Sequence, residues 1–355
     1  MIKDLLKQLW KDKFARIALI VLGIIYFALF FADFIAPYTK DFSDRTMAYV
    51  PPSKIFTLDE NGKLSKPYTY NYKREFDSED LKIIYTLDRS KKHYIKFFSQ
   101  GQPYKFLGLI PMKRHFVTTD REGRLFLLGT DINGRDVFSR ILFGGRISMT
   151  IGFLALFVLF PIGLLYGGIA GYFGGKTDMI MMRFAEAVMS IPSFYLLIIL
   201  ASILPSGMTS VQRFMLIVII LALIGWAGFA RVVRGMVLSI KNQEYVQAAK
   251  SIGASRLRII VKHILPQTTS FVIVAMTLSV PSYILSESGL SFLGLGIQQP
   301  DASWGNMLKE AQEYTNIIYR PWLLTPGFLI FIAVLAFNLI GDTIRDVLDP
   351  KSKVR

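Results

Sequence analysis

The 355-residue sequence contains no cysteine and only three histidines. The absence of cysteine excludes disulfide scaffolds, thiolate metal sites and cysteine nucleophiles, although it leaves the redox compartment open. His93 and His115 each stand alone among their neighbours, so no metal site is expected. Charged residues are also scarce, at 19% of the chain against roughly 25% in soluble domains.

The common catalytic and nucleotide-binding motifs are missing as well. The sequence contains neither H-E-x-x-H nor G-x-S-x-G, so no catalytic residue is assigned. Gly175-Lys176-Thr177 matches the end of a phosphate-binding loop, but Ala170 stands where the first glycine of that loop is required. The chain is therefore not expected to bind a nucleotide or another cofactor itself.

Hydrophobic residues, by contrast, make up 52% of the chain and gather in six runs close to membrane-spanning length. The runs lie at Phe14–Ile35, Ser148–Tyr172, Met179–Leu204, Phe214–Val233, Thr268–Leu285 and Leu323–Ile340. They predict an all-α polytopic membrane protein with six transmembrane helices. Pro161, Pro192 and Pro281 lie inside three runs, where a proline favours either a kink for packing or a hinge. The first run is longer than the apolar core of a signal peptide and is expected to be retained.

The formal net charge is +15, and basic residues flank the apolar runs. No RNA-binding motif, zinc-finger spacing or basic recognition helix accompanies this charge, so nucleic acid is not expected as a partner. Short loops rich in Lys and Arg usually face the cytoplasm. The residues before the first run, between the fourth and fifth, and after the sixth are rich in both, whereas Pro205–Gln212 contains neither. This pattern predicts a multi-pass protein of the cytoplasmic membrane with both termini and residues 244–266 inside.

The segment at 41–128 predicts a small β-rich extracytoplasmic insert domain. Aromatic and β-branched runs typical of strands lie at Tyr68–Tyr72, Ile83–Leu87, Tyr94–Phe98, Tyr104–Ile110 and Arg124–Leu127. The predicted parts of the chain are a cytoplasmic segment with the first span (1–40), the insert (41–128), an interfacial lead-in helix (129–147), a five-helix transmembrane domain (148–345) and a cytoplasmic tail (346–355). In the lead-in, Thr130 or Asp131 is expected to cap a turn, and Asp136 to cap or to pair with Arg135 or Arg140.

Residues 244–266 form a polar, basic segment of helical character between two apolar runs. Ala248 and Ala249 are small enough to let a helix sit deep in a groove, and Gly253 permits a turn between two short helices. Pro266 is expected to end the polar helix. Leu257, Ile260 and Ile264 are expected to anchor the segment to the membrane helices. The segment thus has the composition of a docking surface for another protein.

The stretch Gln247–Gly253, followed by Ile264-Leu265-Pro266, resembles the EAA motif of permease subunits in bacterial ABC importers. Three further stretches, Gly129–Arg140, Ser291–Gly305 and Gly341–Pro350, resemble the dipeptide/oligopeptide group of DppC/OppC-like permeases. The resemblance implies a type I ABC importer permease fold and the transport of di- or oligopeptides. It departs from the family at Gln247, where the motif usually has glutamate. At His263 an aliphatic residue is frequent in the family, although the peptide group commonly has histidine there.

The resemblance further implies that residues 244–266 couple the chain to a cytoplasmic ATPase, which binds the ATP and Mg. The coupling residues that it assigns are Glu244, Gln247, Ala248, Ala249, Gly253, Ala254, Arg256, Leu257, His263, Leu265 and Pro266. The extracytoplasmic family motif would comprise Gly129, Thr130, Asp131, Gly134, Arg135 and Asp136. The implied partners are a second permease subunit (DppB/OppB-like), one or two ABC ATPase subunits, an extracytoplasmic solute-binding protein and the lipid bilayer.

Three alternatives stay open at this point. The same machinery also serves nickel complexes and oligosaccharides in this group of permeases. A membrane-anchored receptor or sensor, with 41–128 as the ligand domain, would need cytoplasmic signalling residues, and only five residues follow Pro350. A secondary carrier would need ionisable residues near the bilayer midplane. The spans contain few, and Arg183 with Glu186 is expected to form an ion pair on one helix face.

Overall fold

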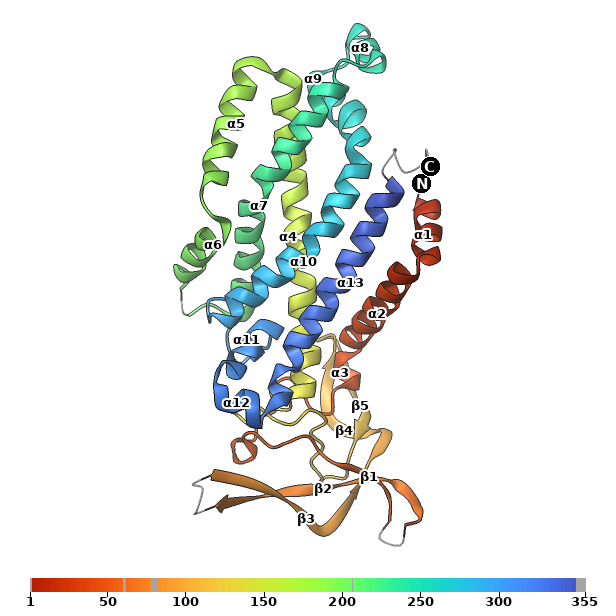
Figure 1. Cartoon of the computed structure of the whole chain (residues 1–355), viewed down its shortest axis with the longest axis vertical. Helices are drawn as coiled ribbons and strands as arrows, with labels where there is room; N and C mark the ends of the chain where they lie inside the picture. Colours follow the sequence, from red (N-terminus) through yellow and green to blue (C-terminus); the bar gives the residue numbers. More distant parts are fainter. Residues whose placement is uncertain (1, 60–61, 78–81, 206, 349–355) are drawn as a thin grey trace. The chain divides into compact units, whose positions relative to one another are not determined.

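The computed structural model describes residues 2–59, 62–77, 82–205 and 207–348 (Figure 1). The chain divides into two compact units. Unit 1 comprises Met1–Leu22, Met149–Leu290 and Ile330–Arg355, and unit 2 comprises Gly23–Ser148 and Ser291–Leu329. Several long helices pass from one unit into the other along the chain, and each unit is described by itself.

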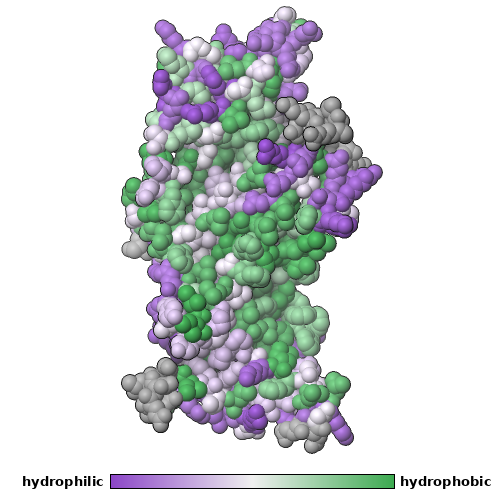
Figure 2. Space-filling model, in the orientation of Figure 1, coloured by the Kyte–Doolittle hydropathy of each residue, from purple (hydrophilic) through white to green (hydrophobic). Residues whose placement is uncertain are grey.

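Unit 1 is helical. Its elements are α1 (Ile2–Lys11), the start of α2 (Lys13–Phe30), most of α4 (Val137–Phe173), α5 (Gly175–Ser190), α6 (Ser193–Ser202), α7 (Ser210–Ile240), α8 (Glu244–Ser251), α9 (Arg256–Ile259), α10 (Thr269–Phe292) and most of α13 (Thr325–Leu348). A π-helical turn, η2 (Ile260–Ile264), and a 3-10 turn, η3 (Leu265–Thr268), join α9 to α10. Figure 2 shows hydrophobic side chains over α10 and α13, and hydrophilic ones over α8 and α1.

The described residues contain five helices long and apolar enough to cross a membrane, or six if α5 and α6 count as one span. The fold is therefore a helical, multi-span one, as predicted, although the third expected span is not straight. Its two parts are bent by 77° at the break before Ser193. Ile191 is extended because the ring of Pro192 disfavours a helical residue before it. Pro161 and Pro281 lie inside α4 and α10 and interrupt neither.

In unit 1, α4 approaches α7 closely through three glycines spaced four residues apart. A Cβ atom on Gly163 would lie 2.6 Å from the Phe229 ring, and one on Gly167 would lie 2.3 Å from the Ala230 carbonyl oxygen. One on Gly171 would lie 2.8 Å from the Arg234 carbonyl oxygen. Small residues at this spacing let two membrane helices pack backbone to backbone.

Unit 2 contains the end of α2, α3 (Ala32–Ile35), a 3-10 turn η1 (Arg45–Met47), two sheets and the start of α4. The first sheet has the antiparallel order β1 (Ile55–Leu58), β2 (Leu64–Asp77), β3 (Lys82–Tyr94). The second is the hairpin of β4 (Lys96–Phe106) and β5 (Ile110–Thr118). The segment after α10 adds α11 (Trp304–Leu308), η4 (Lys309–Gln312), α12 (Tyr314–Tyr319) and η5 (Pro321–Leu324).

The predicted strand runs correspond to these sheets in part. Tyr68–Tyr72 lies in β2 and Ile83–Leu87 in β3. Tyr94–Phe98 extends across the break at Ile95 between β3 and β4, and Tyr104–Ile110 extends across the turn between β4 and β5. The predicted strand at Arg124–Leu127 is wrong. Its backbone amides are satisfied by side chains instead: Asn71 Oδ1, Tyr38 Oη and Ser53 Oγ accept from residues 124, 125 and 126.

The other expected boundaries differ in detail. The lead-in at 129–147 is not a separate helix, because residues 129–136 form a turn and α4 runs without a break from Val137 past residue 148. At the other end of the chain, α13 continues to Leu348. The rest of the predicted tail, and with it Pro350 of the family stretch, lies outside the described residues.

The close α4–α7 contact leads to a stability prediction. Gly167→Ala should destabilise the protein by about 1–3 kcal/mol, because the added methyl group meets backbone atoms that cannot rotate away. Gly152→Ala is the matched control on the same helix, since its Cβ would have neighbours no nearer than 3.5 Å. It should be neutral or stabilising by up to about 1 kcal/mol. Thermal unfolding in mild detergent measures both, and equal midpoints for the two variants would contradict the packing.

Candidate functional site

The segment at 244–266 folds as two short helices joined by a tight turn. Gln243 is extended and precedes α8, and Gly253 has a φ of +79°, a conformation that glycine adopts without strain. The predicted turn at Gly253 is thus confirmed. Pro266 does not end the second helix as predicted, because the π-helical turn before it lets the chain stay helical into α10.

One face of this segment is buried against its own unit. Val246 and Ala249 of α8 pack with Ile259 and Ile264 against Val233, Val237 and Ile240 of α7. Ile260 is buried too, so two of the three predicted anchors hold the segment. Leu257 is not an anchor, since 60% of its side chain is exposed. Burial of each of these valine and isoleucine side chains contributes roughly 1.5–3 kcal/mol to holding α8 and α9 on α7.

The other face is exposed and carries more apolar surface than the sequence suggested. Ile252, at the end of α8, is 85% exposed, and Tyr245 and Val261 are also exposed. The two alanines separate, with Ala248 on the exposed face and Ala249 buried. Of the other predicted coupling residues, these are exposed: Glu244, Gln247, Gly253, Arg256 and Pro266. Ala254, His263 and Leu265 are half-buried.

Polar contacts fix this segment to the ends of α7 and α4. Gln247 Nε2 donates to the Lys241 carbonyl oxygen at 3.1 Å, so this side chain caps the end of α7. A glutamate, which has no hydrogen to donate when ionised, would not make this bond. Lys241 Nζ donates to the Gly171 carbonyl oxygen at 2.9 Å. Lys250 lies over the ring of Tyr172, 5.5 Å from the ring centroid.

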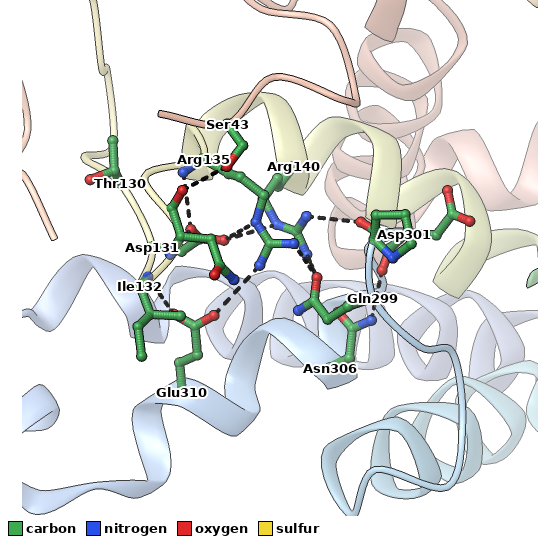
Figure 3. A network of polar contacts seen from close by, with 12 residues as sticks. Ser43, Thr130, Asp131, Ile132, Arg135, Arg140, Gln299, Asp301, Asn306 and Glu310 are labelled. Carbon is green, nitrogen blue, oxygen red and sulfur yellow. Dashed lines mark hydrogen bonds and ion pairs between the residues drawn. The ribbon is translucent and has the colours of Figure 1, made fainter. Parts of the chain in front are cut away.

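A second cluster of predicted residues lies in unit 2, at Gly129–Asp136 (Figure 3). Asp131 Oδ1 accepts from the amides of Asn133 and Arg135, which closes the predicted turn. Thr130 Oγ1 does not cap that turn but joins it to the segment before the sheets, accepting from the Val50 amide at 2.7 Å. Gly134 packs so closely on the Asp44 carbonyl that no side chain fits.

Two arginines that follow this turn form a buried ionic network. Arg135 Nε lies 2.6 Å from Asp131 Oδ2, and Arg140 Nε lies 3.4 Å from the same oxygen. Both guanidinium groups also donate to Gln299 Oε1, and Arg135 faces Glu310 at 3.8 Å (Figure 3). Asp131, not Asp136, is therefore the partner of the arginines. A buried pair of this kind costs about 3–5 kcal/mol if one member is removed.

Asp136 is the N-cap of α4 and is fully buried. Its Oδ2 accepts from the amide and the hydroxyl of Ser139, at 2.7 Å and 2.6 Å. Burial raises the pKa of Asp136 to about 7, although the bonds from Ser139 oppose the shift. Burial and the nearby Asp131 carboxylate likewise raise the pKa of Glu310. Desolvation thus favours the neutral form of both carboxyl groups.

Gln299 and Glu310 are the members of this network that sequence reasoning did not identify. Gln299 lies in the stretch Ser291–Gly305, for which the family resemblance implies no individual residue roles. Glu310 follows that stretch in η4. It accepts a hydrogen bond from the Ile132 amide, 178 residues away in the chain, so no local sequence pattern predicts its place at the turn. Trp304 of α11 places the stretch, because its indole donates to the Ile141 carbonyl oxygen of α4 at 3.0 Å.

Unit 1 also contains a cavity of about 440 Å³ at the bend between α5 and α6. Its polar lining comes from hydroxyl groups rather than charges, and glycines of α7 form part of its wall. The lining includes Ser193, Gly225, Gly228, Ser282, Tyr283 and Ser286. The predicted ion pair of Arg183 and Glu186 is present in α5, at 3.2 Å.

Comparison with known proteins gives these sites a context. Residues 163–354 match the family described as binding-protein-dependent transport system inner membrane component. Residues 1–52 match the N-terminal TM domain of oligopeptide transport permease C. Two solved structures are similar at low level. The MetNI methionine ABC transporter in inward-facing conformations has a TM-score of 0.41 and 19% identity, and covers 58% of this chain and 94% of that one. An amino acid ABC transporter has a TM-score of 0.38 and 16% identity, with 61% and 95% covered.

The curated relatives are more similar in sequence. The dipeptide transport system permease protein DppC of Bacillus subtilis (strain 168) is 47% identical over 225 residues, which is 63% of this chain and 68% of that protein. The oligopeptide permease protein OppC of Haemophilus influenzae is 46% identical over 63% of this chain and 70% of that protein. The glutathione permease protein GsiD of Escherichia coli O6:K15:H31 is 42% identical, over 63% and 72%.

These matches confirm the DppC/OppC-like resemblance and the reading of the chain as a multi-pass inner-membrane transport component rather than a sensor or carrier. The chain belongs to the family of binding-protein-dependent transport system inner membrane components, as a permease of the DppC/OppC-like group.

Proposed function

We propose that this chain is one of two transmembrane subunits of an ATP-driven importer for short peptides. The relatives at 41–47% identity are named for dipeptides, oligopeptides and glutathione, all of which are peptides. The observation that carries the proposal is the segment at 244–266, which packs one face on α7 while its other face is exposed. The implied partners are a DppB/OppB-like permease, one or two ATPases that bind ATP and Mg, and an extracytoplasmic binding protein.

In this proposal the exposed face of α8 and the following turn docks on the ATPase. Ile252 and Leu257 supply an apolar contact, and Ala248 lets the partner approach the helix backbone closely. Arg256 and Glu244 add charged groups at the rim. Gln247 is occupied by the Lys241 carbonyl, so it contributes to the shape of the docking surface more than to a charged contact.

The proposed orientation places this surface in the cytoplasm. Within unit 1, α8 and the turn between α4 and α5 lie towards one end, and α6 with the start of α7 lies towards the other (Figure 1). Basic residues are frequent in the first group, and the connection Pro205–Gln212 has no Lys or Arg. The positive-inside bias supports a cytoplasmic position for the first group and for both termini.

The cavity at the α5–α6 bend is the proposed part of the translocation path in this chain. Its hydroxyl groups at Ser193, Ser282 and Ser286 can donate to and accept from peptide groups of any sequence. Peptide backbones are polar but uncharged between their ends, so an uncharged lining fits them. The wall formed by α7 connects the cavity along one helix to the docking surface.

The exposure of the two alanines gives a test of the coupling surface. Ala248→Cys carrying a benzophenone maleimide should crosslink to the ATPase, in a yield that changes when ATP is added. Ala249→Cys, the matched control, should react slowly with the maleimide and give little crosslink because its side chain is buried on α7. The chain has no native cysteine to confuse the result. Equal crosslinking by both variants would contradict the surface, and labelling of Ala248→Cys only from outside the cell would contradict the orientation.

The cavity gives a second test. Gly228→Leu fills its wall, and a Cβ there would have only the Met189 sulfur within 4 Å, so the helix should tolerate it. Uptake of a labelled tripeptide, with the cognate binding protein present, should fall about tenfold or more, the effect of roughly 1.4 kcal/mol.

Gly235→Leu is the control, since it makes the same change on α7 away from the cavity and has open space around it. It should retain uptake, and both variants should co-purify with the ATPase. Unchanged uptake by Gly228→Leu would remove the cavity from the path, and loss of ATPase co-purification would show a folding defect instead.

A further inference from the structure

The β4–β5 hairpin of unit 2 has an apolar tip, which is unusual for a hairpin that faces water. Leu107, Gly108 and Leu109 form the turn, and Leu109 is 81% exposed. Leu107 and Ile110 on either side of it are exposed as well. Exposed apolar patches of this kind mark sites that contact a protein or a membrane.

One face of the hairpin, with α2 and α3, encloses an apolar groove of about 590 Å³. No polar atom contributes to its lining. It is lined by Phe27, Phe31, Phe34, Ile35, Phe98, Phe106, Met112 and Phe116. The ring centroids of Phe31 and Phe106 lie 5.9 Å apart, and those of Phe34 and Phe116 lie 6.1 Å apart. The helical wall and the hairpin wall of the groove are therefore in direct contact.

The groove continues the lipid-facing side of the first span. Helix α2 is a candidate span of which only 22% is buried, and Ile20, Ile24 and Phe27 form an exposed stripe along it. The apolar part of the span starts after Arg16. About 20 helical residues cross a hydrocarbon core about 30 Å thick, so a span that starts at residue 17 ends near residue 36. The wall formed by Phe31, Phe34 and Ile35 therefore lies at the depth of the acyl chains.

Polar groups at this depth are satisfied within the unit. Asp33 is paired with Arg146 at 2.7 Å and accepts from the Leu107 amide at 3.1 Å, which ties the hairpin to α3. The hairpin still has unpaired strand edges, which do not occur deep in hydrocarbon. Its place is consequently the membrane interface, with the tip and the phenylalanine face towards the acyl chains. Lys105 and Lys113 are exposed on the hairpin and can reach lipid phosphates.

We propose that the β4–β5 hairpin inserts its tip into the outer leaflet and that the phenylalanine groove binds a phospholipid acyl chain. The hairpin then anchors the extracytoplasmic sheets to the bilayer beside α2. This role does not depend on the transported substrate or on ATPase coupling. It depends on α2 being a span, and on the continuity of the groove with the lipid-facing stripe of that helix.

Spin labels on the full-length chain test the insertion. Leu109→Cys and Leu64→Cys each receive a nitroxide and are reconstituted in dioleoylphosphatidylcholine vesicles without any binding protein. Leu64 is the matched control, an 89% exposed leucine at the start of β2 in the other sheet. The Leu109→Cys label should be several-fold more accessible to oxygen than to a water-soluble nickel chelate, and the Leu64→Cys label should show the reverse. A water-exposed Leu109→Cys label overturns the proposal, including the case in which it becomes protected only when the binding protein is added.

A photoreactive lipid tests the groove. Phosphatidylcholine with a diazirine on its acyl chain should label peptides that contain Met112 and Phe116. Met112→Asp should reduce this labelling several-fold, and Met112→Leu should retain it and so control for folding. If Met112→Asp does not fold, labelling of the unaltered chain decides the question. Absence of label from these peptides, with label present on α10 or α13, would overturn acyl-chain binding.

Discussion

The close contact of α4 with α7 is the interaction on which the rest of unit 1 depends. Lipid tails are as apolar as leucine, so membrane helices gain little from the hydrophobic effect and associate by close packing. Gly163, Gly167 and Gly171 remove the side chains that would hold the two backbones apart. The end of α4 then lies where Lys241 and Lys250 can bind it. The segment at 244–266, which we propose docks on the ATPase, is therefore placed by the same packing that holds the helices together.

Helix α7 links the docking surface to the cavity without a break. It contains 31 residues and is about 46 Å long. Its C-terminal end carries the cluster that buries Val246 and Ala249, and its middle contributes Gly225 and Gly228 to the cavity. If an ATPase docks on α8 as proposed, a displacement of α8 is transmitted to the cavity along this one helix. The α5–α6 break at Pro192 is the place in the cavity wall where the chain departs from a straight helix, so it is suited to absorb that movement.

The sequence was sufficient to predict the features that depend on local pattern. The apolar runs predicted the long helices. Gly253 predicted the turn because the left-handed conformation required there is one that glycine adopts without strain. The features that it did not predict depend on tertiary contacts. Ala248 and Ala249 are identical in type, and only the position of α7 makes one exposed and the other buried. Glu310 is far from the turn at Asp131 in the sequence and reaches it only in the folded chain. Arg124–Leu127 is not a strand because side chains distant in the sequence accept hydrogen bonds from its amides.

Buried polar groups need partners within the chain, and this need explains why the segment after α10 lies against the start of α4 in unit 2. Arg135 and Arg140 are too costly to bury without partners, and the side-chain oxygen of Asp131 lies against both guanidinium groups. Gln299 and Glu310 complete the set from a segment that follows α10, so the network closes only when the two ends of the unit are in place. The buried arginines thereby join the segment before α4 to the segment after α10. The turn that resembles the family motif is accordingly a structural junction, which holds the start of α4 against the segment that carries Trp304.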